Sequence, residues 1–169
     1  MKLDLGCGAH KRDGFLGVDI SSACDADIVH DLRVTPWPFE DQSVDEVVCS
    51  HFFEHLTGAE RMPFMEELYR VLKPGASARM ITPYWTSMAA IQDPTHQWPP
   101  LAEASYLYFN KEWRDKAGLQ HYGIGCDFDV DFTFQLAPEL QQRSPQEKQF
   151  AARFYVNAIS EFTAILRRR

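Results

Sequence analysis

Two carboxylates flank a pair of glycines near the start of the chain. Asp4 lies within the apolar residues 3–5, and Gly6-Cys7-Gly8 follows directly. Asp19 lies near the end of a second apolar stretch, residues 15–20. A carboxylate can accept hydrogen bonds from both hydroxyls of a ribose, and glycines let a ligand approach the backbone without a Cβ in the way. This spacing predicts a site for a molecule that contains a nucleoside.

Two cofactors contain a suitable nucleoside, and the glycine loop discriminates between them. A nicotinamide dinucleotide needs a helix N-terminus for its pyrophosphate, a G-x-G-x-x-G loop and an acid roughly 20 residues on. Here Lys11 replaces the third glycine, and Asp19 follows Gly6 by only thirteen residues. S-adenosylmethionine has no phosphate, and its ammonium group suits Asp4. The residues favour S-adenosylmethionine, and a dinucleotide oxidoreductase is the less favoured alternative.

Histidines and acids further along the chain are candidates for proton transfer. Residues 51–55 match H-x-x-E-H, a zinc-hydrolase signature, but they follow a predicted buried strand instead of lying on a helix, so we assign no metal. Asp93-Pro-Thr-His96 follows another predicted strand, and histidine titrates near neutrality. The candidate catalytic residues are therefore His55, His96 and Asp93. The alternatives are a plain turn at 93–96 and a role for 51–55 in orienting the loop.

The elements that must position these residues alternate along the chain. Short apolar runs predict strands at residues 2–5, 15–20, 25–30, 44–49, 78–83 and 127–136. Helical spacing predicts helices over 59–72 and 144–157, and short helices lie within an irregular aromatic and proline-rich segment, 84–126. Residues 159–167 are assigned to a strand paired with 127–136, with a helix as the alternative.

This order of elements is typical of an α/β fold. We expect a Rossmann-like three-layer sandwich, with a mostly parallel sheet and a C-terminal antiparallel strand pair. The length favours a single domain over residues 1–169, in which 84–126 form a cap on the substrate side. The aromatic side chains of this cap either line an acceptor pocket or form a small satellite core.

Composition excludes several classes of protein. The net charge of −7 argues against binding to nucleic acids or membranes, which are themselves negative. The dense basic run at 167–169 is expected to be a solvated tail. The four cysteines match no zinc or disulfide spacing, and no signal peptide or membrane-length apolar run is visible. A cytoplasmic protein with reduced thiols is expected.

Four sequence blocks resemble, in order and spacing, those of class I S-adenosylmethionine-dependent methyltransferases. They are LDLGCG, GVDI, HDLRVTPWPFEDQSVDEVVCSHFFEHL and EELYRVLKPGASARMITP, and together they cover residues 3–83, about half of the chain. The short loop between Gly8 and Asp19 is similar to a branch of small predicted methyltransferases found among glycan and cell-surface biosynthesis genes. The stretch DPTHQWPPLAEASYLYF resembles the variable cap of that branch.

The resemblance implies a set of cofactor-binding residues that runs from the methionine end of the cofactor to its adenine and its methyl group. These are Asp4, Gly6 and Gly8 for the methionine end, Asp19 for the ribose hydroxyls, Ile20 for the adenine ring, Asp31 and the Leu32 amide for the adenine amino group, and Ser50 and His51 beside the methyl group. Ala9 replaces the third glycine of the family loop. Many members also have a helix before the first strand that covers the cofactor. Without it, we expect a more open pocket, or one completed by a second copy of the chain in a homodimer.

The expected activity is transfer of a methyl group to an oxygen or nitrogen atom of a small acceptor, such as a sugar or another metabolite. The sulfonium is already a good leaving group, so the protein mainly aligns the nucleophile, the methyl group and the sulfur. A base is needed only if the nucleophile arrives protonated. The alternative is a non-catalytic subunit that binds S-adenosylmethionine and needs a partner in order to act.

Overall fold

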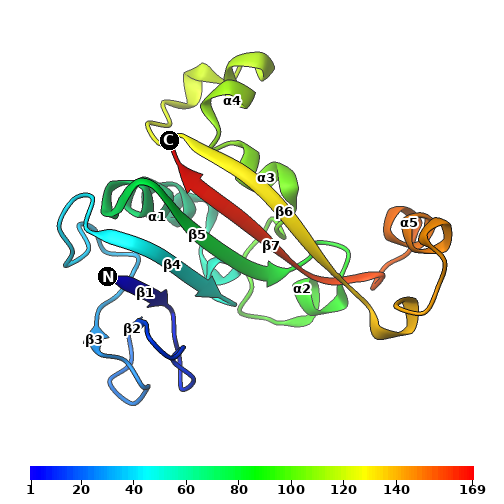
Figure 1. Cartoon of the computed structure of the whole chain (residues 1–169), viewed down its shortest axis with the longest axis horizontal. Helices are drawn as coiled ribbons and strands as arrows, with labels where there is room; N and C mark the ends of the chain where they lie inside the picture. Colours follow the sequence, from blue (N-terminus) through cyan, green and yellow to red (C-terminus); the bar gives the residue numbers. More distant parts are fainter.

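A seven-stranded sheet forms the centre of the molecule, which the computed structural model describes over all residues, 1–169. The strands are β1 (Lys2–Leu5), β2 (Leu16–Asp19), β3 (Ile28–Val29), β4 (Val44–Ser50), β5 (Leu72–Pro83), β6 (Phe128–Leu136) and β7 (Ile159–Arg168). Their order is β3-β2-β1-β4-β5-β7-β6, and Figure 1 shows β7 between β5 and β6.

The directions of the strands confirm the predicted fold class. The four pairings from β3 to β5 are parallel, whereas β7 is antiparallel to both β5 and β6. This is the mostly parallel Rossmann-like sheet with an antiparallel C-terminal pair. The strand assignment of residues 159–167 is correct, and the helical alternative is wrong.

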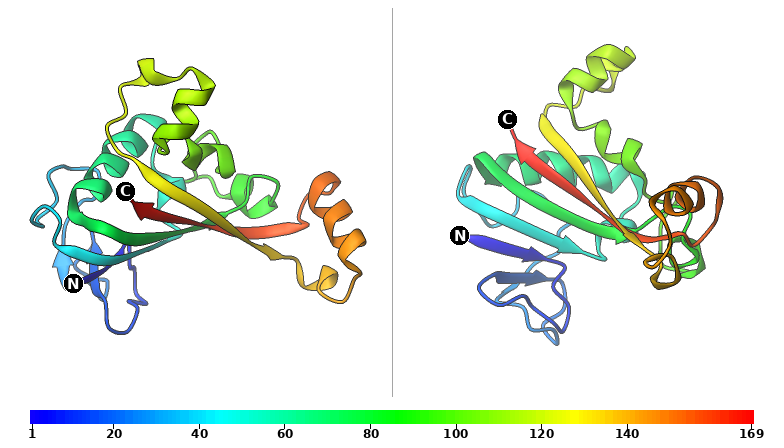
Figure 2. Two further views of the ribbon diagram at one scale, coloured as in Figure 1. Left: turned by 45° about the horizontal axis from the view of Figure 1, so that its top comes forward. Right: turned by 45° about the vertical axis from the view of Figure 1, so that its right-hand side comes forward.

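Helices occur only in the links that follow β4. The α-helices are α1 (Gly58–Val71), α2 (Met88–Gln92), α3 (Glu103–Leu107), α4 (Lys111–Ala117) and α5 (Pro145–Phe154), and the 3₁₀ turns are η1 (Phe53–His55), η2 (Gln120–Tyr122) and η3 (Pro138–Leu140). Loops alone join β1 to β2 and β2 to β3, because these links are too short for a crossover helix. Figure 2 shows that η3 and α5 project beyond the ends of β6 and β7. None of the helices combines the length and apolar character that a membrane crossing requires.

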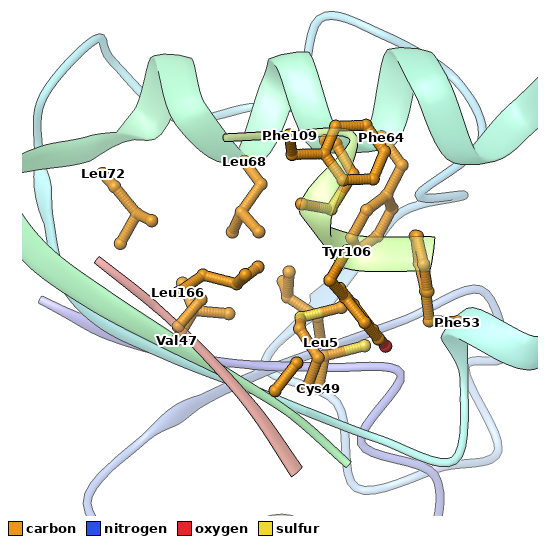
Figure 3. Packing of buried hydrophobic residues seen from close by; sticks show 14 of the residues in the cluster. Leu5, Val47, Cys49, Phe53, Phe64, Leu68, Leu72, Tyr106, Phe109 and Leu166 are labelled. Atoms are coloured by element: carbon orange, nitrogen blue, oxygen red, sulfur yellow. The ribbon is translucent and has the colours of Figure 1, made fainter. Parts of the chain in front are cut away.

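Helix α1 lies across one face of the sheet, and its first turn is specified locally. The Thr57 side chain accepts a hydrogen bond from the Glu60 N–H, and the Thr57 N–H donates to the Glu60 carboxylate at 2.8 Å, which is a capping box. Leu68 points from α1 toward the strands, on the side where Val47 lies (Figure 3), and the Phe64 ring packs against the Phe53 ring with the ring centres 5.4 Å apart. They belong to a core of 28 buried residues, which holds in place the strands β1 and β4 that carry the site.

The end of α1 differs from the prediction. The helix ends at Val71 and β5 begins at the next residue, so residues 73–76 lie inside the strand instead of between two elements. They bulge from the ladder, because the pairing with β4 jumps from Leu72 to Ser77 along β5. Pro74 has no N–H to donate, which favours a break in the ladder at this point.

Of the C-terminal arginines, Arg167 and Arg168 lie in β7 and Arg169 follows it directly, so the expectation of a solvated tail is wrong. The guanidinium of Arg168 lies 4.4 Å from the centre of the Tyr69 ring and donates a hydrogen bond to the Leu72 carbonyl oxygen. Arg169 pairs with Asp129 on β6. Because β7 lies between two other strands, its last residues meet carbonyl oxygens on one side and acids on the other.

Candidate functional site

A cavity of about 250 Å³ opens at the edge of the sheet where β1, β2 and β4 end. Its lining includes five of the residues predicted to bind the cofactor: Gly6, Asp19, Ile20, Asp31 and Leu32. The others in the lining are His30, Arg33, Phe52, His55 and Leu56. The carboxyl ends of parallel strands are the usual position of ligands in α/β sheets, so the cavity lies where a nucleoside is expected.

The carboxylates of Asp4 and Asp19 accept hydrogen bonds from backbone N–H groups in and beside the loop that joins β1 to β2. The Asp19 carboxylate accepts hydrogen bonds from the N–H groups of Gly8 and Ser21, both at 3.0 Å. The Asp4 carboxylate accepts one from the Arg12 N–H at 2.8 Å and is only 5% exposed. Their strands are neighbours in the sheet, but Asp4 does not line the cavity, and its contact with a ligand stays a prediction.

Gly6 and Gly8 both have left-handed backbone conformations, with φ of +68° and +54°. A Cβ on Gly6 would lie 2.7 Å from the side chain of Phe52, whereas a Cβ on Gly8 would meet nothing within 4 Å. Glycine is therefore required at position 6 for two reasons: the Phe52 side chain leaves no room for a Cβ, and the backbone has a left-handed conformation. Phe52, which sequence reasoning missed, narrows the cavity beside the glycine loop.

The end of the cavity predicted to hold adenine combines an exposed apolar side chain with a paired acid. Ile20 is 57% exposed, which leaves it free to pack on a flat ring. The Asp31 carboxylate accepts a hydrogen bond from Arg33 Nη2 at 2.8 Å, and this contact lowers the pKa of Asp31. Arg33 was not predicted, since an arginine two residues from an acid is common on protein surfaces.

Ser50 and His51 lie at the end of β4, outside the lining of this cavity. His51 has a positive φ of 54°, and its ring lies between two acids. Nδ1 is 3.3 Å from Glu54 Oε1, and Nε2 is 2.9 Å from Glu161 on β7. Glu54 first, and then Glu161, raise the pKa of His51 against the effect of its partial burial.

The three candidate catalytic residues come together in space. The rings of His55 and His96 meet edge to face with their centres 4.8 Å apart. Thr95, which was not predicted, joins Asp93 to His55: its hydroxyl donates to Asp93 Oδ1 at 2.6 Å and lies 3.0 Å from His55 Nδ1. His96 Nδ1 lies 3.2 Å from the Ala90 carbonyl oxygen.

Arg61 holds the segment that contains His96 against the turn that contains His55. It is a buried residue of α1, and it donates hydrogen bonds to the carbonyl oxygens of Gln97 at 3.1 Å and Pro99 at 2.8 Å. The Gln97 N–H donates in turn to the carbonyl oxygen of Glu54 at 2.8 Å. These contacts join parts of the chain that are about forty residues apart, which no local pattern could indicate.

A second hollow, of about 160 Å³, lies beside His96. Asp93 and His96 line it together with Trp98 and nearby residues of the cap, whereas His55 lines the first cavity. Each ring of the pair therefore lines one of the two hollows. Glu54 is beside it, and Glu54, His55 and His96 bring one ligating atom each to within 4.8 Å of one another.

Comparison with protein families gives one match. A model described as a methyltransferase domain matches residues 3–80, which include β1 to β4, α1 and most of β5. A search of curated proteins finds no match.

Solved structures of methyltransferases resemble the whole chain. An S-adenosylmethionine-dependent methyltransferase from Archaeoglobus fulgidus superposes with a TM-score of 0.71 at 21% identity, covering 99% of this chain and 85% of that one. A chain from the Haloferax volcanii complex that contains the Trm112 methyltransferase activator gives 0.60 at 18% identity, with coverages of 99% and 81%. The small RNA methyltransferase HEN1 gives 0.58 at 16% identity, with coverages of 99% and 23%.

Proposed function

We propose that the chain is a class I S-adenosylmethionine-dependent methyltransferase, which binds S-adenosylmethionine and methylates an oxygen or nitrogen atom of a small acceptor; the methyltransferase domain matched over residues 3–80 and the fold shared with solved methyltransferases support this proposal. The observation that carries this proposal is that the adjoining rings of His55 and His96 line one hollow each. The hollow at the ends of β1, β2 and β4 takes the nucleoside of the cofactor. The second hollow, which residues of the cap segment line, takes the acceptor.

In this proposal the cofactor lies along the glycine loop. Asp19 binds the ribose hydroxyls: each of its oxygens already accepts one backbone N–H and keeps a further lone pair. Ile20 packs on the adenine, and Asp31 and the Leu32 amide face its amino group. The methionine end extends past Gly6 and Gly8 toward Asp4, with Ser50 and His51 beyond it.

The reaction is an in-line displacement at the methyl carbon. A lone pair of the acceptor forms the new bond to carbon, the carbon–sulfur bond breaks, and its electron pair stays on sulfur, which leaves S-adenosylhomocysteine. Alignment of the three atoms supplies most of the acceleration. Where the nucleophile carries a proton, His55 or His96 accepts it, and Asp93 acts on His55 through Thr95.

A small acceptor is supported by the size of the second hollow and by the net charge of −7. The hollow of about 160 Å³ suits a sugar-sized group better than a folded macromolecule. An RNA acceptor is the alternative suggested by the structural similarity to HEN1. Transfer of labelled methyl groups to sugars, amines and short RNA strands separates these acceptors, and a preference for RNA would refute the small-acceptor proposal.

The second candidate function is a cofactor-binding subunit that needs a partner. The similarity to a chain from a complex with a methyltransferase activator favours it. Light scattering shows whether the chain forms the homodimer expected from the sequence, and methyl transfer by the isolated chain would refute the need for a different partner.

We also propose that the protein is located in the cytoplasm. All four thiols are free, which supports a location in this reducing compartment.

Calorimetry tests the assigned ribose contact. We expect Asp19→Ala to weaken S-adenosylmethionine binding by about 1–3 kcal/mol, roughly 5- to 150-fold, through lost hydrogen bonds to the hydroxyls. The matched control is Asp25→Ala, which removes an exposed acid of the next loop and should leave the affinity unchanged. Equal affinity in the wild type and in Asp19→Ala would refute the ribose role, and tighter binding of NAD than of S-adenosylmethionine would refute the cofactor site.

A further inference from the structure

Glu54 is a buried acid whose carboxylate has no hydrogen-bond donor. The residue is 5% exposed, and neither carboxylate oxygen accepts a hydrogen bond. His51 Nδ1 lies 3.3 Å from Oε1, where a protonated ring forms an ion pair, but this contact does not have the geometry of a hydrogen bond and it leaves Oε2 without any partner. A buried carboxylate without donors is costly, so a group that satisfies it is expected nearby.

Each of the two neighbouring histidines has one ring nitrogen facing an oxygen and the other without a hydrogen bond, although His96 Nε2 lies 3.7 Å from Asp93 Oδ2. The only hydroxyl hydrogen of Thr95 goes to Asp93, so His55 Nδ1–H donates to the Thr95 oxygen, and the lone pair of His55 lies on Nε2. His96 Nδ1 faces the Ala90 carbonyl oxygen, which can only accept, so the lone pair of His96 also lies on Nε2. Metal-binding histidines are typically oriented in this way, by a carbonyl or a hydrogen-bonded carboxylate behind the ring.

From these observations we propose that Glu54, His55 and His96 bind a divalent transition-metal ion, such as Zn²⁺, Co²⁺ or Mn²⁺. Two imidazole nitrogens and one carboxylate oxygen are a common ligand set for such ions. One possible ligand atom of each residue lies within 4.8 Å of the others, and ligand bonds of about 2.1 Å require these atoms to draw closer when the ion binds. Mg²⁺ prefers six oxygen ligands and suits the site less well.

The position of the site suggests what the ion does there. Three protein ligands leave coordination positions open, and His96 lines the hollow assigned to the acceptor. An acceptor hydroxyl bound to the ion would lose its proton to water more readily, which replaces the need for a histidine base. This role rests on the proposed function, whereas binding of the ion does not.

Titration of the chelator-treated protein tests the proposal. We expect Zn²⁺, followed by calorimetry, and Co²⁺, followed by its visible absorption, to bind with one ion per chain. Mg²⁺ should bind at least about 100-fold more weakly. Glu54→Gln and His96→Ala should each weaken Zn²⁺ binding by at least about 10-fold, and Thr95→Val, which removes the support behind His55, by about 10- to 100-fold. His10→Ala and His121→Ala are the matched controls, because both histidines are exposed and outside the cluster.

The proposal is overturned if neither Zn²⁺ nor Co²⁺ binds saturably, if only Mg²⁺ binds, or if the cluster variants bind Zn²⁺ as the wild type does. Circular dichroism identifies a variant that has not folded. In that case the Zn²⁺ affinity of Thr95→Val, which changes only an exposed residue of a loop, decides whether the site exists. Calorimetry with S-adenosylmethionine on the metal-free protein separates the two proposals. Cofactor binding without metal binding refutes the metal site alone, and metal binding without cofactor binding refutes the cofactor site alone.

Discussion

Gly6 and Gly8 differ in what a side chain would meet, although the G-x-G pattern makes them look equivalent. Both have a positive φ, which costs a residue with a Cβ about 1–2 kcal/mol. Only at Gly6 would the Cβ also collide with Phe52. The first glycine therefore allows an internal contact, and the second mainly allows the turn of the backbone.

This difference predicts unequal effects of two identical substitutions. We expect Gly6→Ala to lower the free energy of unfolding by about 2–4 kcal/mol, from strain and overpacking together. Gly8→Ala is the control and should cost about 1–2 kcal/mol, from strain alone. Urea denaturation measures both, and equal losses would show that Phe52 moves aside without cost.

His51 predicts a pH dependence of stability. Its pKa is raised in the folded protein by Glu54 and Glu161, so its stabilising contribution is fully present below the unfolded pKa of about 6.5 and is lost as the pH rises through the folded pKa. The difference in unfolding free energy between wild type and His51→Gln should therefore be larger near pH 6 than near pH 8.5. His10→Gln, at an exposed histidine without an ion pair, should give no such change. A difference that grows with pH would contradict the assignment.

At the scale of elements, two helices begin with the same local signal but pack differently. Thr57 and Glu60 form a capping box at α1, and Ser144 and Glu147 form one at α5. Helix α1 buries six of its residues, whereas α5 buries only Ala151. The same capping pattern therefore begins a helix that packs on the core, α1, and a helix that lies largely outside the core, α5.

Alanine at each cap separates local from global stability. Thr57→Ala should lower the free energy of global unfolding by about 1 kcal/mol, because α1 unfolds with the core. Ser144→Ala should mainly speed hydrogen exchange within α5, because a weakly packed helix opens on its own. Urea denaturation with hydrogen exchange measures both effects. Equal losses of global stability would show that α5 is part of the same cooperative unit.

At the scale of the whole molecule, the last residues of the chain join β7 to α1 and β5. Arg168 lies over the Tyr69 ring of α1 and donates to the Leu72 carbonyl oxygen at the start of β5. Arg167, its neighbour in β7, is exposed and makes no side-chain hydrogen bond or ion pair. The C-terminus therefore connects elements that lie about a hundred residues apart in the sequence.

The two arginines form a matched pair for mutation. Arg168→Ala should lower the free energy of unfolding by about 1–2 kcal/mol, through the lost cation–π contact and hydrogen bond. Arg167→Ala should change it by less than about 0.5 kcal/mol, as is usual for exposed positions. Thermal and urea unfolding of both variants provide the measurement. Identical stabilities would support the solvated tail that the basic run alone suggests.

The sequence by itself determined the features that depend on neighbouring residues. The apolar runs, the glycine turn after residue 5 and the helical spacing over residues 59–72 are local signals, and they led to the α/β class. The resemblance of four sequence blocks to methyltransferases, together with these signals, led to five residues of the cavity lining. Only the tertiary structure decided that Phe52 packs on Gly6, that Arg61 holds the cap beside η1, and that Glu54 is buried without a donor. Each of these facts joins separate segments of the chain or depends on burial, and packing of the complete core determines both.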